Sequence, residues 1–175
     1  MVEIRHVKAE ILTREGFAPY GEVMFRESDH SSLTPTPTPP PPPARLNLTA
    51  GTPRLYLMHL PKRGLRIQSI ARHIKVTQCL GSVTGTGWYM GVAQGKDMDP
   101  SARPDLETFK VFYIPKEAGI KLNEGTWHAG PHFDDPEMTF YNLELDNTNQ
   151  DDFYSFDFAH ELGLAFEVEP VTNHV

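Results

Sequence analysis

Polar and hydrophobic residues alternate along most of this chain in short runs, and Gly, Pro or Asn residues separate one run from the next. The clearest run is MTFYNLEL at residues 138–145. A period of two places successive side chains on opposite faces of a strand, so each run predicts a half-buried β-strand. We expect about ten short strands and almost no helix.

The segment 65–73 has the same alternation and ends in a histidine. We expect it to form one continuous strand, because the period of two puts Ile67, Ser69, Ala71 and His73 on a single face. A histidine at the end of such a strand can bind a metal or move a proton.

The remaining runs complete an all-β pattern. Thr13 is expected to cap a single helical turn that stops before Gly21. Many short strands with turn signals between them predict a β-sandwich or barrel. The further strands are expected at residues 2–8, 21–25, 54–60, 76–83, 88–93, 109–114, 153–158 and 164–168.

Composition and charge narrow the class of protein. The 175 residues fit one domain over 1–175. No run approaches the roughly 18 apolar residues of a membrane helix, and the first residues lack a secretory signal pattern, so we expect a cytoplasmic protein. The net charge of −7 argues against nucleic acid and anionic membranes as partners. The single cysteine, Cys79, lies in an apolar run and is expected to be buried filler in a reducing compartment.

One segment has low complexity. Residues 34–43 read TPTPTPPPPP, a run that favours solvated polyproline II. We expect a proline-rich surface loop inserted into the domain at about residues 31–44. The alternative is a docking site for a proline-binding module.

Two histidine segments carry the candidate chemistry. In the first, His73 is followed five residues later by Gln78, and Ala71 lies two residues before it. In the second, Asn123, Gly125 and His128 have the spacing Asn-x-Gly-x-x-His.

These segments resemble the two motifs of the cupin barrels, His-x-His followed by Glu and Pro-x-Gly-x-x-His. His73 stands at the second His of the first motif and Gln78 at its Glu. Ala71 replaces the first His, and Asn123 replaces the Pro of the second motif. The resemblance implies a cupin-like double-stranded β-barrel, or jelly roll, with few short helices. It also implies a metal site formed by His73, Gln78 and His128.

The order and spacing of several segments resemble the ureidoglycolate lyase family over about residues 3–146, without the proline-rich insertion. The segments are residues 13–23, Arg72–His73 with Thr77–Gln78, and Trp127–His128. Residues 76–81, 121–131 and 140–149 look closer to the eukaryotic, plant-like branch. The bacterial pattern has a Glu where this chain has Ala71, Tyr-His where it has Leu122–Asn123, and a second His where it has Ala129.

This resemblance implies a homodimeric enzyme of allantoin and purine degradation that releases urea and glyoxylate from ureidoglycolate. Nickel is associated with some members, so the implied cofactor is a divalent metal, nickel or manganese. The implied partner is a small polar carboxylate substrate.

Elimination of urea needs a base for the hydroxyl proton, an acid for the leaving nitrogen and a cation for the carboxylate. His73 and His128 are the candidate acid and base, in either order. Lys121 or Arg72 would hold the carboxylate. Lys121 is preferred, because alternation places Arg72 on the face opposite His73.

The remaining candidates line the expected site. Gln78 and Asn142 are expected to bind the ureido group, and Glu144, on the same strand face as Asn142, would be a base or ligand. Asn123 suits a turn or the substrate, and Trp127 is expected to form a wall at the mouth of the barrel. The other histidines are interpreted as surface or packing residues, and the pairs Asp134–Asp135 and Asp151–Asp152 as solvated loop ends.

Two other functions fit the same pattern. One is a cupin enzyme, an isomerase or lyase, that acts on another small hydroxy or keto acid. The other is a cupin that binds a small metabolite without catalysis.

Overall fold

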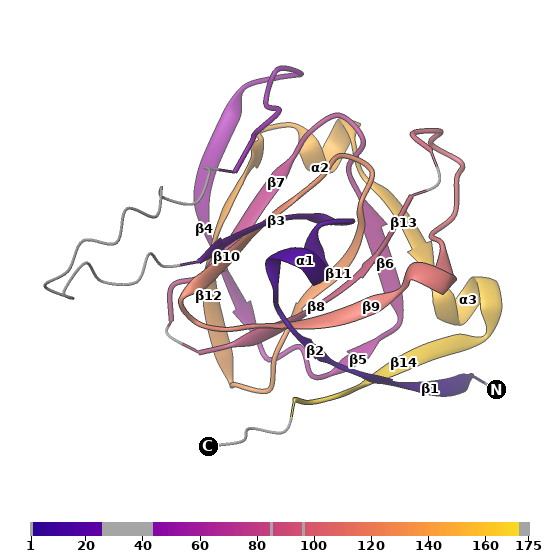
Figure 1. The fold of residues 1–175 in the computed structure, drawn as a ribbon. Helices are drawn as coiled ribbons and strands as arrows, with labels where there is room; N and C mark the ends of the chain where they lie inside the picture. The colour runs from indigo at the N-terminus through magenta and orange to yellow at the C-terminus, as the bar shows by residue number, and fades with distance from the viewer. Residues whose placement is uncertain (1, 26–43, 85, 96, 172–175) are drawn as a thin grey trace, which may run out of the picture.

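The computed structural model describes residues 2–25, 44–84, 86–95 and 97–171. Over these residues the chain forms short strands in three sheets, with three short α-helices and one 3-10 turn (Figure 1). The expected capped turn is present as α1 (Arg14–Phe17), where the Thr13 hydroxyl accepts a hydrogen bond from the Gly16 amide. The other helices are α2 (Thr148–Asp151) and α3 (Phe158–Leu162), and the 3-10 turn spans Leu106–Thr108.

A five-stranded sheet forms one wall of the molecule. Its strand order is β3-β10-β7-β12-β4, and its paired neighbours are antiparallel. The long strands β12 and β4 pair along their whole length, from Glu137 opposite Pro61 to Leu145 opposite Pro53. The bounds are β3 Gly21–Phe25, β4 Pro53–Pro61, β7 Gln78–Ser82, β10 Ala118–Leu122 and β12 Glu137–Leu145.

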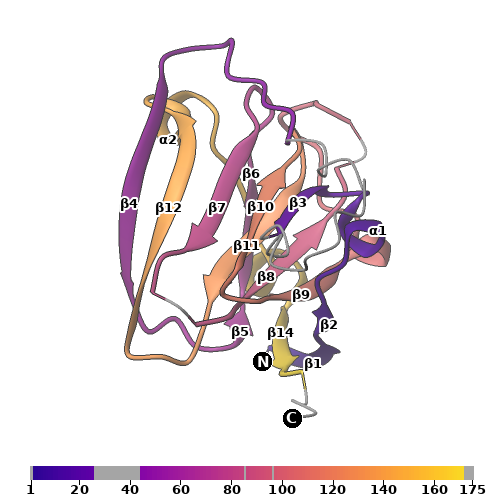
Figure 2. The ribbon, with the colours of Figure 1, turned by 60° about the vertical axis from the view of Figure 1, so that its left-hand side comes forward.

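A six-stranded sheet faces it, in the order β13-β6-β11-β8-β9-β2. Figure 2 shows the two walls, with β4, β12 and β7 in one layer and β6, β11 and β8 in the other. The bounds are β2 Glu10–Ile11, β6 Ser69–Arg72, β8 Trp88–Ala93, β9 Lys110–Ile114, β11 Trp127–His132 and β13 Tyr154–Asp157.

A small third sheet, β1-β14-β5, joins the two ends of the described chain. Strands β1 and β14 are parallel neighbours, and Figure 1 shows them side by side at the lower right. The bounds are β1 Glu3–Lys8, β5 Arg66–Ile67 and β14 Leu164–Glu169.

The six-stranded sheet has apolar packing on both faces, and β8 shows how its sequence achieves this. Trp88, Met90 and Val92 point between the two large sheets and are fully buried, while Ala93 faces a second cluster outside them. Burying side chains of this size contributes about 1.5–3 kcal/mol each. The second cluster includes Trp127, Phe156, Phe158 and Phe166.

The all-β jelly-roll prediction is confirmed. The expected strand at residues 65–73 is wrong in one respect: it is split into β5 and β6 at Gln68, whose carbonyl accepts a hydrogen bond from Phe158. The split turns Ile67 into the outer cluster, while Ala71 and His73 face a cavity. The alternation did not predict α2 and α3. Nearly all of the proline-rich insertion, including residues 34–43, lies outside the described residues.

No helix in the described part of the chain is long and apolar enough to cross a membrane.

Candidate active site

The space between the two large sheets is apolar on the side of β8 and β9 and polar on the side of β4, β6 and β12. A cavity of about 710 Å³ lies on the polar side. Such a volume falls in the range of about 300–1,000 Å³ that small-molecule sites occupy. It is lined by residues of β4, β5, β6, β7, β11, β12 and β13 and of α2 and the segment that follows it.

His73 and His128 meet in this cavity. Their ring centroids lie 5.3 Å apart. His73 follows the end of β6, and His128 is the second residue of β11, paired with Ala71 of β6. The sequence therefore identified a pair of imidazoles that the fold does bring together.

Each imidazole has a defined tautomer. His73 Nδ1 lies 2.6 Å from the carbonyl oxygen of Asp152, and His128 Nδ1 lies 3.1 Å from that of Thr126. A carbonyl oxygen only accepts, so both Nδ1 atoms carry the proton. In the neutral rings this leaves the two Nε2 atoms as acceptors, available to a ligand or a metal.

His128 is held neutral. Burial and, to a smaller extent, the neighbouring His73 lower its pKa to about 3, against the opposing effect of the hydrogen bond to Thr126. A group with this pKa is unprotonated at neutral pH, so the Nε2 atom of His128 is an acceptor there.

Glu144 lines the cavity, and both of its carboxylate oxygens accept hydrogen bonds from neighbouring side chains. Its side chain is 1% exposed, and Oε1 lies 2.6 Å from Arg54 Nη2 and 3.2 Å from the Tyr56 hydroxyl. Its other oxygen accepts a hydrogen bond from Gln78 Nε2 at 2.9 Å. The carboxylate therefore orients its neighbours, and each oxygen already has a donor.

Gln78 and Asn142 present acceptors without partners. Gln78 Nε2 donates a hydrogen bond to the Glu144 carboxylate, and Asn142 Nδ2 donates one to the Tyr56 hydroxyl at 2.9 Å. Among the described residues, Gln78 Oε1 and Asn142 Oδ1 are buried without a hydrogen-bond partner, and both residues line the cavity. A buried unpaired acceptor is costly, so each oxygen needs a donor that the described side chains do not supply.

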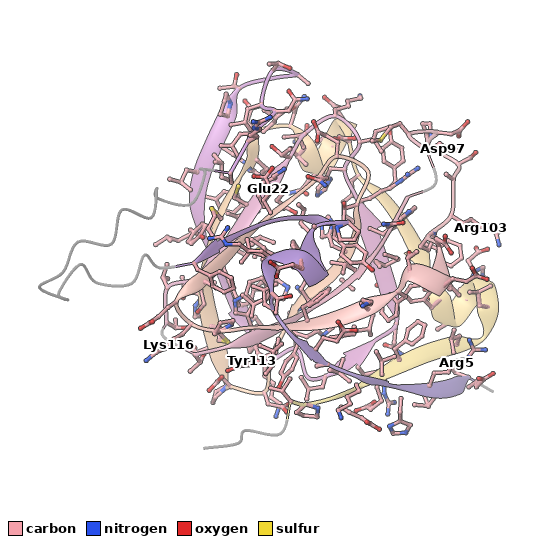
Figure 3. The ribbon with its side chains drawn as sticks, in the orientation of Figure 1. Arg5, Glu22, Asp97, Arg103, Tyr113 and Lys116 are labelled. Atoms are coloured by element: carbon pink, nitrogen blue, oxygen red, sulfur yellow. The ribbon has the colours of Figure 1, made fainter. Side chains whose placement is uncertain are left out.

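Lys121 does not reach the cavity. Its ammonium lies 2.7 Å from Glu22 Oε1 and donates to Asn123 Oδ1 at 2.7 Å. Glu22, labelled in Figure 3, comes from β3, the strand that neighbours β10. Asn123 lines only a smaller void behind the histidine pair, which His73, Gln78 and His128 also line.

Trp127 lies in the outer cluster and does not line the cavity. The Arg72 guanidinium lies 4.7 Å above its ring and donates to the carbonyls of Asp97 and Asp99. Figure 3 labels Asp97 on the loop after β8. Arg72 is fully buried in this position, on the face away from His73, as the alternation indicated.

The cationic side of the cavity was not predicted from the sequence. Lys62, Arg63 and Arg66 follow the end of β4 and line the cavity. Lys62 is paired with Asp134 and Arg66 with Glu167. Within the described residues, Arg63 has no hydrogen bond or ion pair. The signal was the group of three cations after Pro61, which lies outside both motifs.

His132, one of the histidines interpreted as surface or packing residues, is 9% exposed and also lines the cavity. Its Nδ1 donates to the Gly64 carbonyl, and burial together with nearby Arg63 lowers its pKa. The interpretation of the pair Asp151–Asp152 requires correction. Asp152 is buried, with 4% exposure, so it is not a solvated loop end. Asp151 is exposed as expected.

A divalent metal needs several donor atoms gathered around one point. No group of three or more His, Cys, Asp or Glu side chains within the described ranges is arranged to hold a metal ion. Gln78 lies outside those residue types, and its unpartnered Oε1 supplies a third acceptor beside the two imidazoles. Two imidazole nitrogens and one amide oxygen are donor types that a divalent cation such as nickel or manganese accepts.

A jelly-roll barrel with paired histidines and buried amides in a polar cavity is consistent with the cupin class of proteins. The sequence model of the ureidoglycolate lyase family matches residues 4–161, and the chain therefore belongs to that family. Membership supports a lyase connected with ureidoglycolate and purine metabolism. A comparison with curated proteins gives no match.

Proposed function

We propose that this protein splits ureidoglycolate into urea and glyoxylate. The observation that carries the proposal is the presence, in one cavity, of two buried amide oxygens and two imidazole Nε2 atoms that have no hydrogen-bond partner among the described residues. The family match supports the same reaction.

The ureido group supplies what the amide oxygens need. It carries N–H donors on both nitrogens, and Gln78 Oε1 and Asn142 Oδ1 accept them. The amide nitrogen of Gln78 is bound to Glu144 and that of Asn142 to Tyr56, so each amide has its oxygen left to accept from the substrate. A site built to pair such donors rejects analogues that lack them, because the oxygens would stay unpaired.

Arg63 is the best-placed cation for the substrate carboxylate. Lys121 and Arg72 are engaged elsewhere, with Glu22 and with backbone carbonyls. Arg63 lines the cavity beside His132 and retains its donors for a ligand. A guanidinium binds a carboxylate through two parallel hydrogen bonds.

Proton transfer falls to His73. Its Nε2 accepts the proton of the substrate hydroxyl as the carbon–oxygen double bond of glyoxylate forms and the carbon–nitrogen bond breaks. The same imidazolium then gives that proton to the leaving nitrogen, which completes urea. His128, held neutral, accepts a hydrogen bond from the substrate and fixes its orientation.

His73, His128 and Gln78 would hold a divalent metal, nickel or manganese, if the enzyme uses one. When bound, the metal would act as a Lewis acid on the substrate oxygens. The unpartnered Gln78 Oε1 supports this second arrangement. Elemental analysis and calorimetric titration of Gln78→Glu against wild type test it. Tighter binding by the carboxylate variant is expected, and no binding by either protein would refute it.

The setting of the enzyme is part of the proposal. Its sequence favours the plant-like branch of the family, a cytoplasmic location and a homodimer. Ureidoglycolate places it in allantoin degradation.

The test is glyoxylate release from ureidoglycolate by purified protein, measured above the spontaneous rate with and without nickel or manganese. His73→Gln should abolish the enzymatic rate. His59→Gln, on the exposed outer face of β4, is the control and should leave it unchanged. A wild-type rate equal to the spontaneous one would refute the lyase. Turnover of another hydroxy or keto acid would favour the first alternative, and binding without turnover the second.

A further inference from the structure

Asp152 makes three contacts with the segment that carries His73. Its backbone carbonyl accepts the His73 Nδ1 proton at 2.6 Å. Its two carboxylate oxygens accept hydrogen bonds from the amides of Ile74 and Lys75, each at 2.9 Å. Asp152 therefore forms hydrogen bonds with the His73 imidazole and with the two backbone amides that follow it.

The backbone of Asp152 is itself anchored. It ends α2, and its amide donates to the carbonyl of Thr148 at 3.0 Å. The Thr148 hydroxyl accepts from the amide of Leu145, the last residue of β12. Helix α2 thus connects the strand that carries Asn142 and Glu144 to the histidine on the opposite sheet.

From this geometry we propose that Asp152 is a positioning residue for the reaction: it fixes the tautomer and the orientation of His73. Its carboxylate holds residues 73–75 at a set distance from its own carbonyl, and the carbonyl keeps the His73 proton on Nδ1. The Nε2 lone pair then faces the cavity. The catalytic consequence rests on the function proposed above, but the tautomer does not.

The first experiment measures the tautomer directly. Nitrogen-15 spectra of the imidazoles at neutral pH report which ring nitrogen carries the proton. Wild type should show His73 protonated at Nδ1. In Asp152→Ala, His73 should become a mixture of the two tautomers. His128, which bonds to Thr126, should keep its signals and serves as the internal control.

Matched variants separate positioning from general damage. Asp151→Asn changes the neighbouring exposed carboxylate, which accepts only from Asn147 within the described contacts, and should leave His73 as in wild type. Asp152→Asn keeps the size of the side chain and one acceptor oxygen, and should shift the tautomer less than Asp152→Ala. It also serves if the alanine variant does not fold.

The second readout is catalytic. Loss of a group that orients a functional histidine costs roughly 10- to 100-fold at metal sites. We expect kcat of Asp152→Ala to fall about tenfold or more on that scale, with a smaller change in KM. An unchanged His73 tautomer in both Asp152 variants would overturn the proposal, as would equal changes at His73 and His128. If wild type has no lyase activity, the proposed reaction fails while the tautomer result still stands or falls by itself.

Discussion

Acidification should destabilise this protein through His128. In the unfolded chain an imidazole binds its proton near pH 6.5, whereas in the folded protein the pKa is lowered to about 3. The folded pKa is depressed, so the contribution to stability is complete above pH 6.5 and is lost as the pH falls from 6.5 towards 3. One pKa unit corresponds to about 1.4 kcal/mol. Between pH 8 and pH 5 the loss should therefore reach about 2 kcal/mol.

Urea denaturation of wild type and His128→Gln at several pH values between 8 and 5 measures this loss. The two proteins share all other titrating groups, so the difference between their free energies of unfolding isolates His128. The free energy of unfolding of wild type should fall by about 2 kcal/mol relative to that of His128→Gln as the pH falls from about 8 to about 5. A constant difference over this range would show that His128 titrates normally in the folded protein and would refute the argument for a neutral acceptor.

The other predictions concern the wall of the cavity and the core. Arg54→Met removes the hydrogen bond from the partly exposed guanidinium to the buried Glu144 carboxylate and should cost about 2 kcal/mol in urea denaturation. The exposed Arg5→Met control should cost less than about 1 kcal/mol, and equal costs would contradict the role of burial. Arg72→Lys loses the fork that reaches two carbonyls and should cost about 2 kcal/mol, whereas a change below about 0.5 kcal/mol would mean that the loop does not need it. Cys79 is buried and its pKa is raised to about 11, so thiol reagents at pH 8 should label it only after unfolding, and rapid labelling of the native protein would contradict its burial.

Local sequence pattern predicted most strands, because the alternation in 138–145 and the apolar run in 88–93 are properties of neighbouring residues. The pairing of His73 with His128 followed from motif spacing. The partners of Lys121 could not be predicted, since Glu22 reaches it from β3, a strand distant in sequence. The cations after Pro61 and the buried Asp152 were missed for a related reason. Their roles depend on which segments the fold places across the cavity, and the sequence pattern of one segment does not contain that information.

The unpartnered oxygens of Gln78 and Asn142 set stability against activity. Each unpaired buried acceptor costs about 1–3 kcal/mol, and on the proposed function a bound ureido group would relieve that cost. An apolar side chain of similar shape at Asn142 would remove that cost and raise the melting temperature while it weakened substrate binding. Selection for stability alone would therefore favour an apolar residue at this position, whereas selection for the proposed activity would keep the amide.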